Sequence, residues 1–454
     1  MIASINPANG ETLKTFEEMD EAAIEDALGN ANAVFPAFSK RSKLKERLEC
    51  LSKLATLLRE EKESLAKIMT LEMGKPVLQS EAEIDKCAVC CEYYVKNTER
   101  ILENTVIKTE NSKSYVRWLP MGPILAVMPW NFPIWQVIRF AAPALAAGNV
   151  VLLKHASNVP QCALRIEELC LKAGFPVGTF KTLLIGSSKV KAIIQDERVK
   201  GVTLTGSEPA GRAVAATAGN EIKPAVLELG GADPFIVMPS AKIEKAVATA
   251  LKARTMNNGQ SCIAAKRFIV HSKVYNAFID QLSSALHEMK IGNPLHRDVE
   301  IGPLATTDIR DELAEQVAAT VDAGATIVFE GSVPEGEGAW FPPTILTHIP
   351  ENSPGYSEEF FGPVACVFKV ESIDEAIELA NATRFGLGSA AWTNDEGEQV
   401  RFIDELEAGF TAINGMTTSD PRLPFGGVKA SGIGRELADL GMKAFLNAKT
   451  VTIN

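Results

Sequence analysis

The segments "GPILAVMPW" at 122–130 and "NVVLLKHA" at 149–156 decide the predicted fold of this chain. Each is a short, almost continuous apolar run, and the helical pattern "QVIRFAAPALAAG" lies between them. Apolar strands that are separated by helices are typical of a parallel sheet covered on both faces. The alternation continues through "FKTLLIG", "GVTLTGS" and "PAVLELGG". We therefore predict an α/β fold over 122–230, with ligands beyond the carboxyl ends of the strands.

The flanking segments extend this pattern. Residues 20–105 repeat apolar positions at helical spacing, and a second block of alternating strands and helices runs from about 234 to 425. Two further segments, "KSYVRWL" at 113–119 and "KTVTIN" at 449–454, alternate apolar and polar residues like exposed edge strands. Because edge strands are usually covered or paired, we expect these two to pair with each other and to extend a sheet in a partner subunit.

Composition excludes several classes of protein. The 46% hydrophobic and 23% charged content is that of an ordinary globular protein, and 454 residues suggest two to four domains. The net charge of −11 argues against a nucleic-acid partner. The amino terminus lacks the pattern of a signal peptide, and no apolar run approaches the roughly 18 residues of a membrane span. We expect a cytoplasmic enzyme with no membrane partner.

The eight cysteines show no framework spacing, so we expect reduced thiols. The spacing of "CAVCC" at 87–91 resembles half of a metal site, but no second cysteine or histidine pair follows at ligand spacing. We expect no metal site there or elsewhere.

Three polar residues stand where packing alone would not place them: Asn131 in "MPWNFP", Glu228 in "LELGG" and Cys262 in "NNGQSC". Taken singly, they fit a turn residue, a solvated or paired carboxylate and a buried thiol. Together they suit carbonyl chemistry. A carboxylate in apolar surroundings has a raised pKa and can act as a base near neutral pH. A thiolate can attack the carbonyl, and an amide can stabilise the oxyanion that develops.

Motifs along nearly the whole chain carry a family resemblance. "TLEMGKP", "MPWNFP", "LTGSEPAG", "EEFFGPV" and "LPFGGVKASGIGRE" accompany "LELGG" and, 34 positions beyond Glu228, Cys262. The sequence resembles the NAD(P)-dependent aldehyde dehydrogenase superfamily. "MPWNFPIWQV", "KHA" and "CIAAKRF" are most similar to the bacterial succinate-semialdehyde dehydrogenases.

The resemblance implies an aldehyde dehydrogenase fold with three parts. A Rossmann-like cofactor-binding domain would comprise 1–109 and 121–229, and an α/β catalytic domain would comprise 230–429. A small β oligomerisation arm, 110–120 and 440–454, would build a homodimer or a homotetramer.

The resemblance also implies a reaction. Cys262 attacks an aldehyde to give a thiohemiacetal, whose oxyanion is held by the Asn131 side chain and the backbone N–H of Cys262. Hydride passes to the nicotinamide and leaves a thioester, and Glu228 then activates the water that hydrolyses it.

The cofactor is expected to be NADP, with NAD as the weaker alternative. No G-x-G-x-x-G follows a strand, but Gly206 and Ser207 stand between a strand and a helix, where phosphate binds well; a tight surface turn is the alternative. Ser157 in "KHASN" takes the place of a glutamate that binds the adenosine ribose in NAD-preferring relatives. A serine there, beside the cation of Lys154, leaves room for a 2′-phosphate.

Four more residues are assigned to the cofactor by the resemblance. Glu359 would hold the nicotinamide ribose and Phe361 would pack near the ring; Trp130 and Leu229 complete the set. A solvated carboxylate before a Gly-Pro turn is the alternative for Glu359.

The substrate is expected to be succinic semialdehyde. In the resembling dehydrogenases, an arginine eight residues after the catalytic asparagine binds the far carboxylate, and Arg139 has that spacing. Ser419 matches a serine of the substrate loop, and Trp135 would wall the same tunnel. Met256 stands where some of those enzymes carry a second arginine.

Other functions stay open at this point. The chain is compatible with a broader dehydrogenase of short aliphatic aldehydes, with one that acts on glutarate semialdehyde, or with a silent binding or structural homologue.

Overall fold

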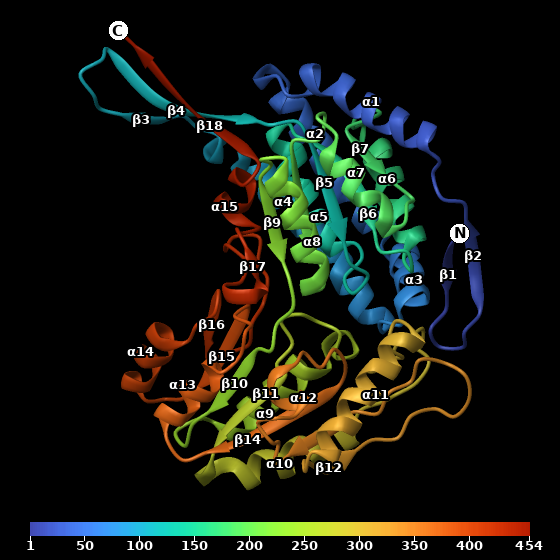
Figure 1. Cartoon of the computed structure of the whole chain (residues 1–454), viewed down its shortest axis with the longest axis vertical. Helices are drawn as coiled ribbons and strands as arrows, with labels where there is room; N and C mark the ends of the chain where they lie inside the picture. The colour runs from blue at the N-terminus through green and yellow to red at the C-terminus, as the bar shows by residue number, and fades with distance from the viewer.

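A computed structural model describes residues 1–454. Its strands form an amino-terminal hairpin, a six-stranded sheet, a seven-stranded sheet and a three-stranded arm (Figure 1). In Figure 1 the two large sheets lie one above the other, and the arm projects from the upper part of the molecule. None of the helices combines the length and the apolar composition needed to span a membrane.

The six-stranded sheet confirms the parallel sheet predicted for 122–230. Its order is β17-β9-β8-β5-β6-β7, and all neighbours are parallel except the short β17, which runs antiparallel to β9. The chain builds outward from β5 in both directions, so the strand order reverses between β5 and β8, where such sheets open a crevice for ligands. The strands are β5 (Pro123–Met128), β6 (Val150–His155), β7 (Phe180–Thr182), β8 (Gly201–Thr205), β9 (Ala225–Glu228) and β17 (Gly432–Ile433).

Helices of the amino-terminal half share one core with this sheet. A single cluster of 68 buried residues joins them, so the helices predicted for 20–105 are not a separate unit. The helices are α1 (Glu21–Phe38), α2 (Leu44–Glu60), α3 (Lys62–Met73), α4 (Val77–Ile101), α5 (Trp135–Ala147), α6 (Pro160–Ala173), α7 (Val190–Gln195) and α8 (Glu208–Asn220).

The seven-stranded sheet has the order β12-β13-β14-β11-β10-β15-β16, parallel except for β12. Along β10, Phe235 and Val237 enter one apolar cluster and Ile236 enters another, so both faces of the sheet are covered. The strands are β10 (Pro234–Val237), β11 (Arg267–His271), β12 (Thr326–Glu330), β13 (Thr344–Thr347), β14 (Val364–Val370), β15 (Gly388–Trp392) and β16 (Phe410–Ile413). The helices are α9 (Ile243–Thr255), α10 (Ser272–His287), α11 (Thr307–Asp322), α12 (Pro354–Ser357), α13 (Ile373–Asn381) and α14 (Glu396–Glu405).

The arm consists of the two edge strands and one strand that the sequence analysis missed. β4 (Lys113–Pro120) pairs antiparallel with β18 (Leu446–Ile453) along its whole length, and β3 (Thr105–Ile107) adds to the other side of β4. α15 (Ala438–Lys443) leads into β18. The boundaries of the three predicted domains stay a prediction.

The amino-terminal hairpin of β1 (Ile2–Ile5) and β2 (Thr12–Phe16) was also not predicted. β2 is mostly exposed, so it lacks the apolar run that marks the central strands.

Candidate active site

The parallel strands bring the predicted site residues to one edge of the six-stranded sheet. Trp130 and Asn131 follow β5, Gly206 and Ser207 follow β8, and Glu228 ends β9. Because the carboxyl ends of parallel strands lie along the same edge, these residues border the crevice between β5 and β8.

The loop after β5 is fixed by His155, the last residue of β6. The Nε2 atom of His155 lies 2.8 Å from the carbonyl of Pro133, and Nδ1 lies 3.2 Å from the carbonyl of Met128 and 2.9 Å from the N–H of Ala156. Burial lowers the pKa of His155 to about 4, so the ring is neutral at physiological pH. His155 therefore holds the loop that carries Asn131. The sequence offered no signal for this role.

The loop before Cys262 is held in an unusual backbone conformation. Asn257 and Asn258 have a φ of 57°, and Gly259 has a φ of 77°. This left-handed region suits glycine and tolerates asparagine. The Asn258 amide donates to the carbonyls of Gly74 and Pro303 at 2.9 and 2.8 Å. These bonds fix the loop against both the amino-terminal and the carboxyl-terminal halves of the chain.

Asn131 and the cysteine loop are in direct contact. The Asn131 amide donates to the carbonyl of Gln260 at 3.1 Å, and Asn257 donates in return to the carbonyl of Asn131 at 2.7 Å. An amide has two N–H donors. One N–H of Asn131 is therefore free to donate to a ligand in the cavity that Asn131 and Cys262 both line.

Two cavities meet at Cys262, which is the one residue that lines both. The first has a volume of about 390 Å³ and the second about 570 Å³. We call them the cofactor cavity and the substrate funnel. The cofactor cavity is lined by six of the eight predicted cofactor residues, Trp130, Gly206, Ser207, Leu229, Glu359 and Phe361. The substrate funnel is lined by all three predicted substrate residues, Trp135, Arg139 and Ser419.

The thiol of Cys262 is protonated at rest. Burial raises its pKa to about 12, and the nearby cations of Arg139 and Lys266 oppose that rise. The thiolate needed for attack is therefore unfavourable before ligands bind.

Glu228 is buried, as its apolar strand predicted, but the charged side chains of Glu436 and Arg139 lie near it. It is 2% exposed, and neither of its carboxyl oxygens has a hydrogen-bond partner. Burial raises the pKa of Glu228 well above its ordinary value; the nearby Glu436 raises it further, and Arg139 opposes the rise. The carboxyl lines neither cavity.

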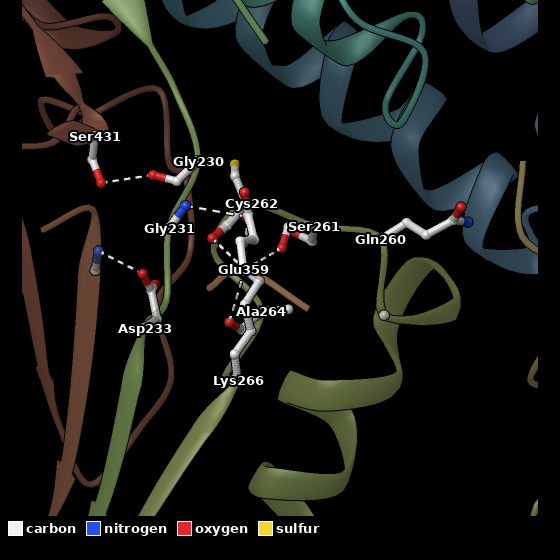
Figure 2. Close-up of polar contacts among 12 residues, drawn as sticks. Gly230, Gly231, Asp233, Gln260, Ser261, Cys262, Ala264, Lys266, Glu359 and Ser431 are labelled. Carbon is white, nitrogen blue, oxygen red and sulfur yellow. Dashed lines mark hydrogen bonds and ion pairs between the residues drawn. The ribbon is translucent and has the colours of Figure 1, made fainter. Parts of the chain in front are cut away.

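Glu359 is not a solvated carboxylate. Its side chain is 20% exposed; Oε1 accepts the N–H of Gly231 at 3.1 Å and pairs with Nζ of Lys266 at 3.2 Å. Lys266 also donates to the carbonyls of Ser261 and Cys262, both at 2.9 Å, while the sulfur of Cys262 points away from it (Figure 2). The sequence analysis missed Lys266, although a lysine in the mostly apolar segment "CIAAKRF" was a signal.

Lys154 and Ser157 do not line the cofactor cavity. They lie at the carboxyl end of β6, the strand next to β5, where Ser157 is exposed and Lys154 has no carboxylate partner. The first N–H groups of α8 have no side-chain cap. Uncapped N–H groups, an unpaired lysine and the Trp130–Phe361 edge-to-face pair fit a phosphorylated dinucleotide.

Arg139 carries an internal partner that the sequence analysis did not anticipate. It is 2% exposed, forms an ion pair with Glu436 and donates from Nη2 to Oγ1 of Thr205 at 3.1 Å. The guanidinium has five N–H donors, and its Nη1 atom makes no hydrogen bond. Arg139 is therefore a funnel cation whose charge is already balanced.

Comparisons with known proteins agree with these features. The family model described as "Aldehyde dehydrogenase family" matches residues 1–451. The succinate-semialdehyde dehydrogenase [NADP(+)] of Mycolicibacterium paratuberculosis is 54% identical over 100% of this chain and 96% of its own length. Its counterpart from Mycobacterium tuberculosis is 53% identical over 100% of this chain and 99% of its own.

A solved structure extends the likeness to the fold. Succinic semialdehyde dehydrogenase from Streptococcus pyogenes, in complex with NADP+, superposes with a TM-score of 0.97 and 36% identity, over all of both chains. The resemblance inferred from the motifs is confirmed: the chain belongs to the aldehyde dehydrogenase family.

Proposed function

We propose that this protein oxidises succinic semialdehyde to succinate with NADP as the oxidant. One observation carries the proposal: Cys262 is the only residue shared by the cofactor cavity and the substrate funnel. A thiol in that position meets an aldehyde from one side and a hydride acceptor from the other. The names of the relatives support the same substrate and cofactor.

Different side chains of the protein carry out the successive steps of the reaction. Cys262 loses its proton to solvent and adds to the aldehyde carbon, and the free N–H of Asn131 with the backbone N–H of Cys262 holds the oxyanion. NADP held in the cofactor cavity would supply the acceptor for the hydride that leaves that carbon. Glu228 then takes a proton from water, and the hydroxide that forms adds to the thioester carbon. The C–S bond breaks, the carboxylic acid is released, and the proton on Glu228 returns to the Cys262 sulfur. Because burial favours the neutral carboxyl of Glu228, its ionised form is a strong base.

The proposed preference for NADP depends on two residues at the carboxyl end of β6. Ser157 adds no negative charge there, and the unpaired Lys154 supplies a cation on the same strand end. Both groups favour a 2′-phosphate over a bare hydroxyl.

Substrate choice rests on the funnel. Arg139 offers Nη1, and Ser419 and Trp135 line the same wall. Met256 also lines the funnel, in place of the second arginine of some relatives. Apolar groups such as Leu78 and Leu251 line it too, which favours some turnover of neutral short aldehydes as a second activity.

The homo-oligomer and the cytoplasmic location belong to the same proposal. Val106 and Ile107 on β3 are 70% and 49% exposed, which is unusual for apolar side chains on an arm with a free edge. Light scattering distinguishes dimer, tetramer and monomer. The eight cysteines form no disulfide, which suits a reducing compartment.

A steady-state assay tests the proposed function. Succinic semialdehyde, glutarate semialdehyde and butanal are each oxidised with NADP and with NAD. We expect the highest kcat/KM for succinic semialdehyde with NADP. Equal values for butanal would replace the proposal with a broad aldehyde dehydrogenase, and equal or better values with NAD would remove the cofactor preference.

A further inference from the structure

Lys86 is a cation of the substrate funnel to which the sequence analysis gave no role. It lies on α4 and lines the funnel together with Trp135, Arg139 and Ser419. Its Nζ atom donates to Oγ of Ser419 at 2.6 Å and stands 4.1 Å from the centre of the Trp135 ring. Two residues predicted to bind substrate therefore have Lys86 between them.

The charges of the funnel single Lys86 out. Three cations are buried or half-buried in its wall, and two of them have internal carboxylates: Lys75 pairs with Glu83, and Arg139 pairs with Glu436. Lys86 forms no ion pair. Its charge is therefore the uncompensated one on the inner wall.

The unpaired state of Lys86 is costly. Burial and, to a smaller extent, repulsion from Arg139 lower its pKa to about 8. A ligand that brings a negative charge to Nζ would remove this cost. A neutral ligand would not.

The hydrogen-bond directions leave donors for such a ligand. An ammonium has three N–H donors, and only one is used on Ser419. Because the Ser419 oxygen accepts that bond, its own O–H is free to donate. An ammonium and a hydroxyl 2.6 Å apart can both donate to one carboxylate.

We propose that Lys86, with Ser419, is the principal anchor for the carboxylate of the semialdehyde, and that Arg139 contributes a secondary, already balanced charge. This inference rests on the proposed function. Lys86 takes the place of the second arginine that some relatives carry at the position of Met256, but it reaches the funnel from a different element. The substrate class follows as short aldehydes with a carboxylate at the far end.

Substrate discrimination tests the assignment. In Lys86→Met, we expect the ratio of kcat/KM for succinic semialdehyde to kcat/KM for butanal to fall about 10- to 100-fold, mostly through KM, because one charged hydrogen bond is lost. Lys86→Arg keeps the charge and should restore most of the ratio. Lys96→Met removes an exposed lysine from the same helix and serves as the matched control.

A pH series adds a readout that packing alone would not move. In the wild type, KM for succinic semialdehyde should rise above pH 8 as Lys86 loses its proton, whereas KM for butanal should not. The break should vanish in Lys86→Arg. The other charged or titratable groups around Lys86 are Glu83, Cys87 and Cys90 on α4, Arg139 on α5, and Asp420, whose carboxylate is bonded to Arg422.

The outcomes separate this inference from the function beneath it. If the wild type does not prefer succinic semialdehyde to butanal, the proposed function fails. If the wild type does prefer succinic semialdehyde, and Lys86→Met changes the ratio by less than about twofold because kcat/KM is unchanged or falls equally for both substrates, Lys86 is not the anchor. If Lys96→Met lowers the ratio equally, the effect comes from the net charge of α4 and not from a contact between Lys86 and the substrate.

Discussion

The cofactor cavity and the substrate funnel share Cys262 but are built differently. The cofactor cavity is lined in part by residues that directly follow strands, such as Trp130 after β5 and Ser207 after β8, and in part by α11. The funnel is lined by side chains from helix surfaces and a distant loop, such as Lys86 on α4 and Ser419. Strand ends are placed by topology, whereas helix surfaces are brought together only by packing. Short motifs therefore indicate residues of both cavities, but they do not indicate how the side chains of the funnel pair with one another.

The largest effect is expected where the two cavities meet. Cys262→Ser should lower the oxidation of every aldehyde by at least about 1000-fold, because a hydroxyl is a far weaker nucleophile than a thiolate. NADP affinity, measured by fluorescence titration, should change little since the cavity walls remain. Cys50→Ser, at a half-buried thiol that lines neither cavity, is the control. Substantial turnover by Cys262→Ser would show that Cys262 is not the nucleophile, although it lines both cavities.

Glu228 lines neither cavity, so its loss should affect turnover and spare binding. In Glu228→Gln, we expect kcat to fall about 100- to 10,000-fold, while one equivalent of reduced cofactor still forms in a rapid first turnover. Stopped-flow absorbance measures both phases.

The pH dependence of Glu228 follows from its environment. A base must be ionised to act, and burial raises the pKa of Glu228 above its ordinary value. Thioester hydrolysis in the wild type should therefore accelerate as the pH rises through that elevated pKa, and Glu228→Gln should lose this dependence. If Glu228→Gln does not form one equivalent of reduced cofactor in a rapid first turnover, Glu228 acts in the formation of the thioester and not in its hydrolysis.

The same contrast explains what the sequence could predict. The apolar strands predicted the parallel sheet, and the polar residues at their ends placed Asn131 and Glu228 at one edge of it, because the carboxyl ends of parallel strands lie along the same edge. β3 escaped prediction because it has three residues, all exposed. The motifs supplied the family, and the comparisons confirmed it.

The funnel shows where sequence reasoning ended. The hydrogen bond between Lys86 and Ser419 joins residues 333 positions apart, and no local pattern around either residue indicates the other. Arg139 had a recognisable spacing, but its pairing with Glu436 depends on how the loop after β17 returns to α5. Side-chain pairing across distant elements is decided by tertiary packing.

Changing Ser157 should affect the cofactor and leave the funnel alone. Ser157→Glu places a carboxylate where the 2′-phosphate is proposed to bind, so the ratio of kcat/KM for NADP to kcat/KM for NAD should fall about 100-fold. KM for succinic semialdehyde should stay within about twofold. Ser157→Ala removes only the hydroxyl and should have a smaller effect. An unchanged ratio in Ser157→Glu would locate the 2′-phosphate elsewhere.

The smallest effect tests whether the two cavities are independent. Thr205 lines the cofactor cavity, yet its hydroxyl accepts the hydrogen bond from Arg139 of the funnel. Thr205→Val keeps the shape and leaves a buried N–H of Arg139 without an acceptor, at a cost of about 1–3 kcal/mol. We expect KM for succinic semialdehyde to rise about 3- to 10-fold and KM for NADP to change less, while Thr205→Ser behaves like the wild type. If Thr205→Val instead raises only KM for NADP, a change in the cofactor cavity does not affect substrate binding in the funnel. Arg139 would then keep its orientation through Glu436 alone.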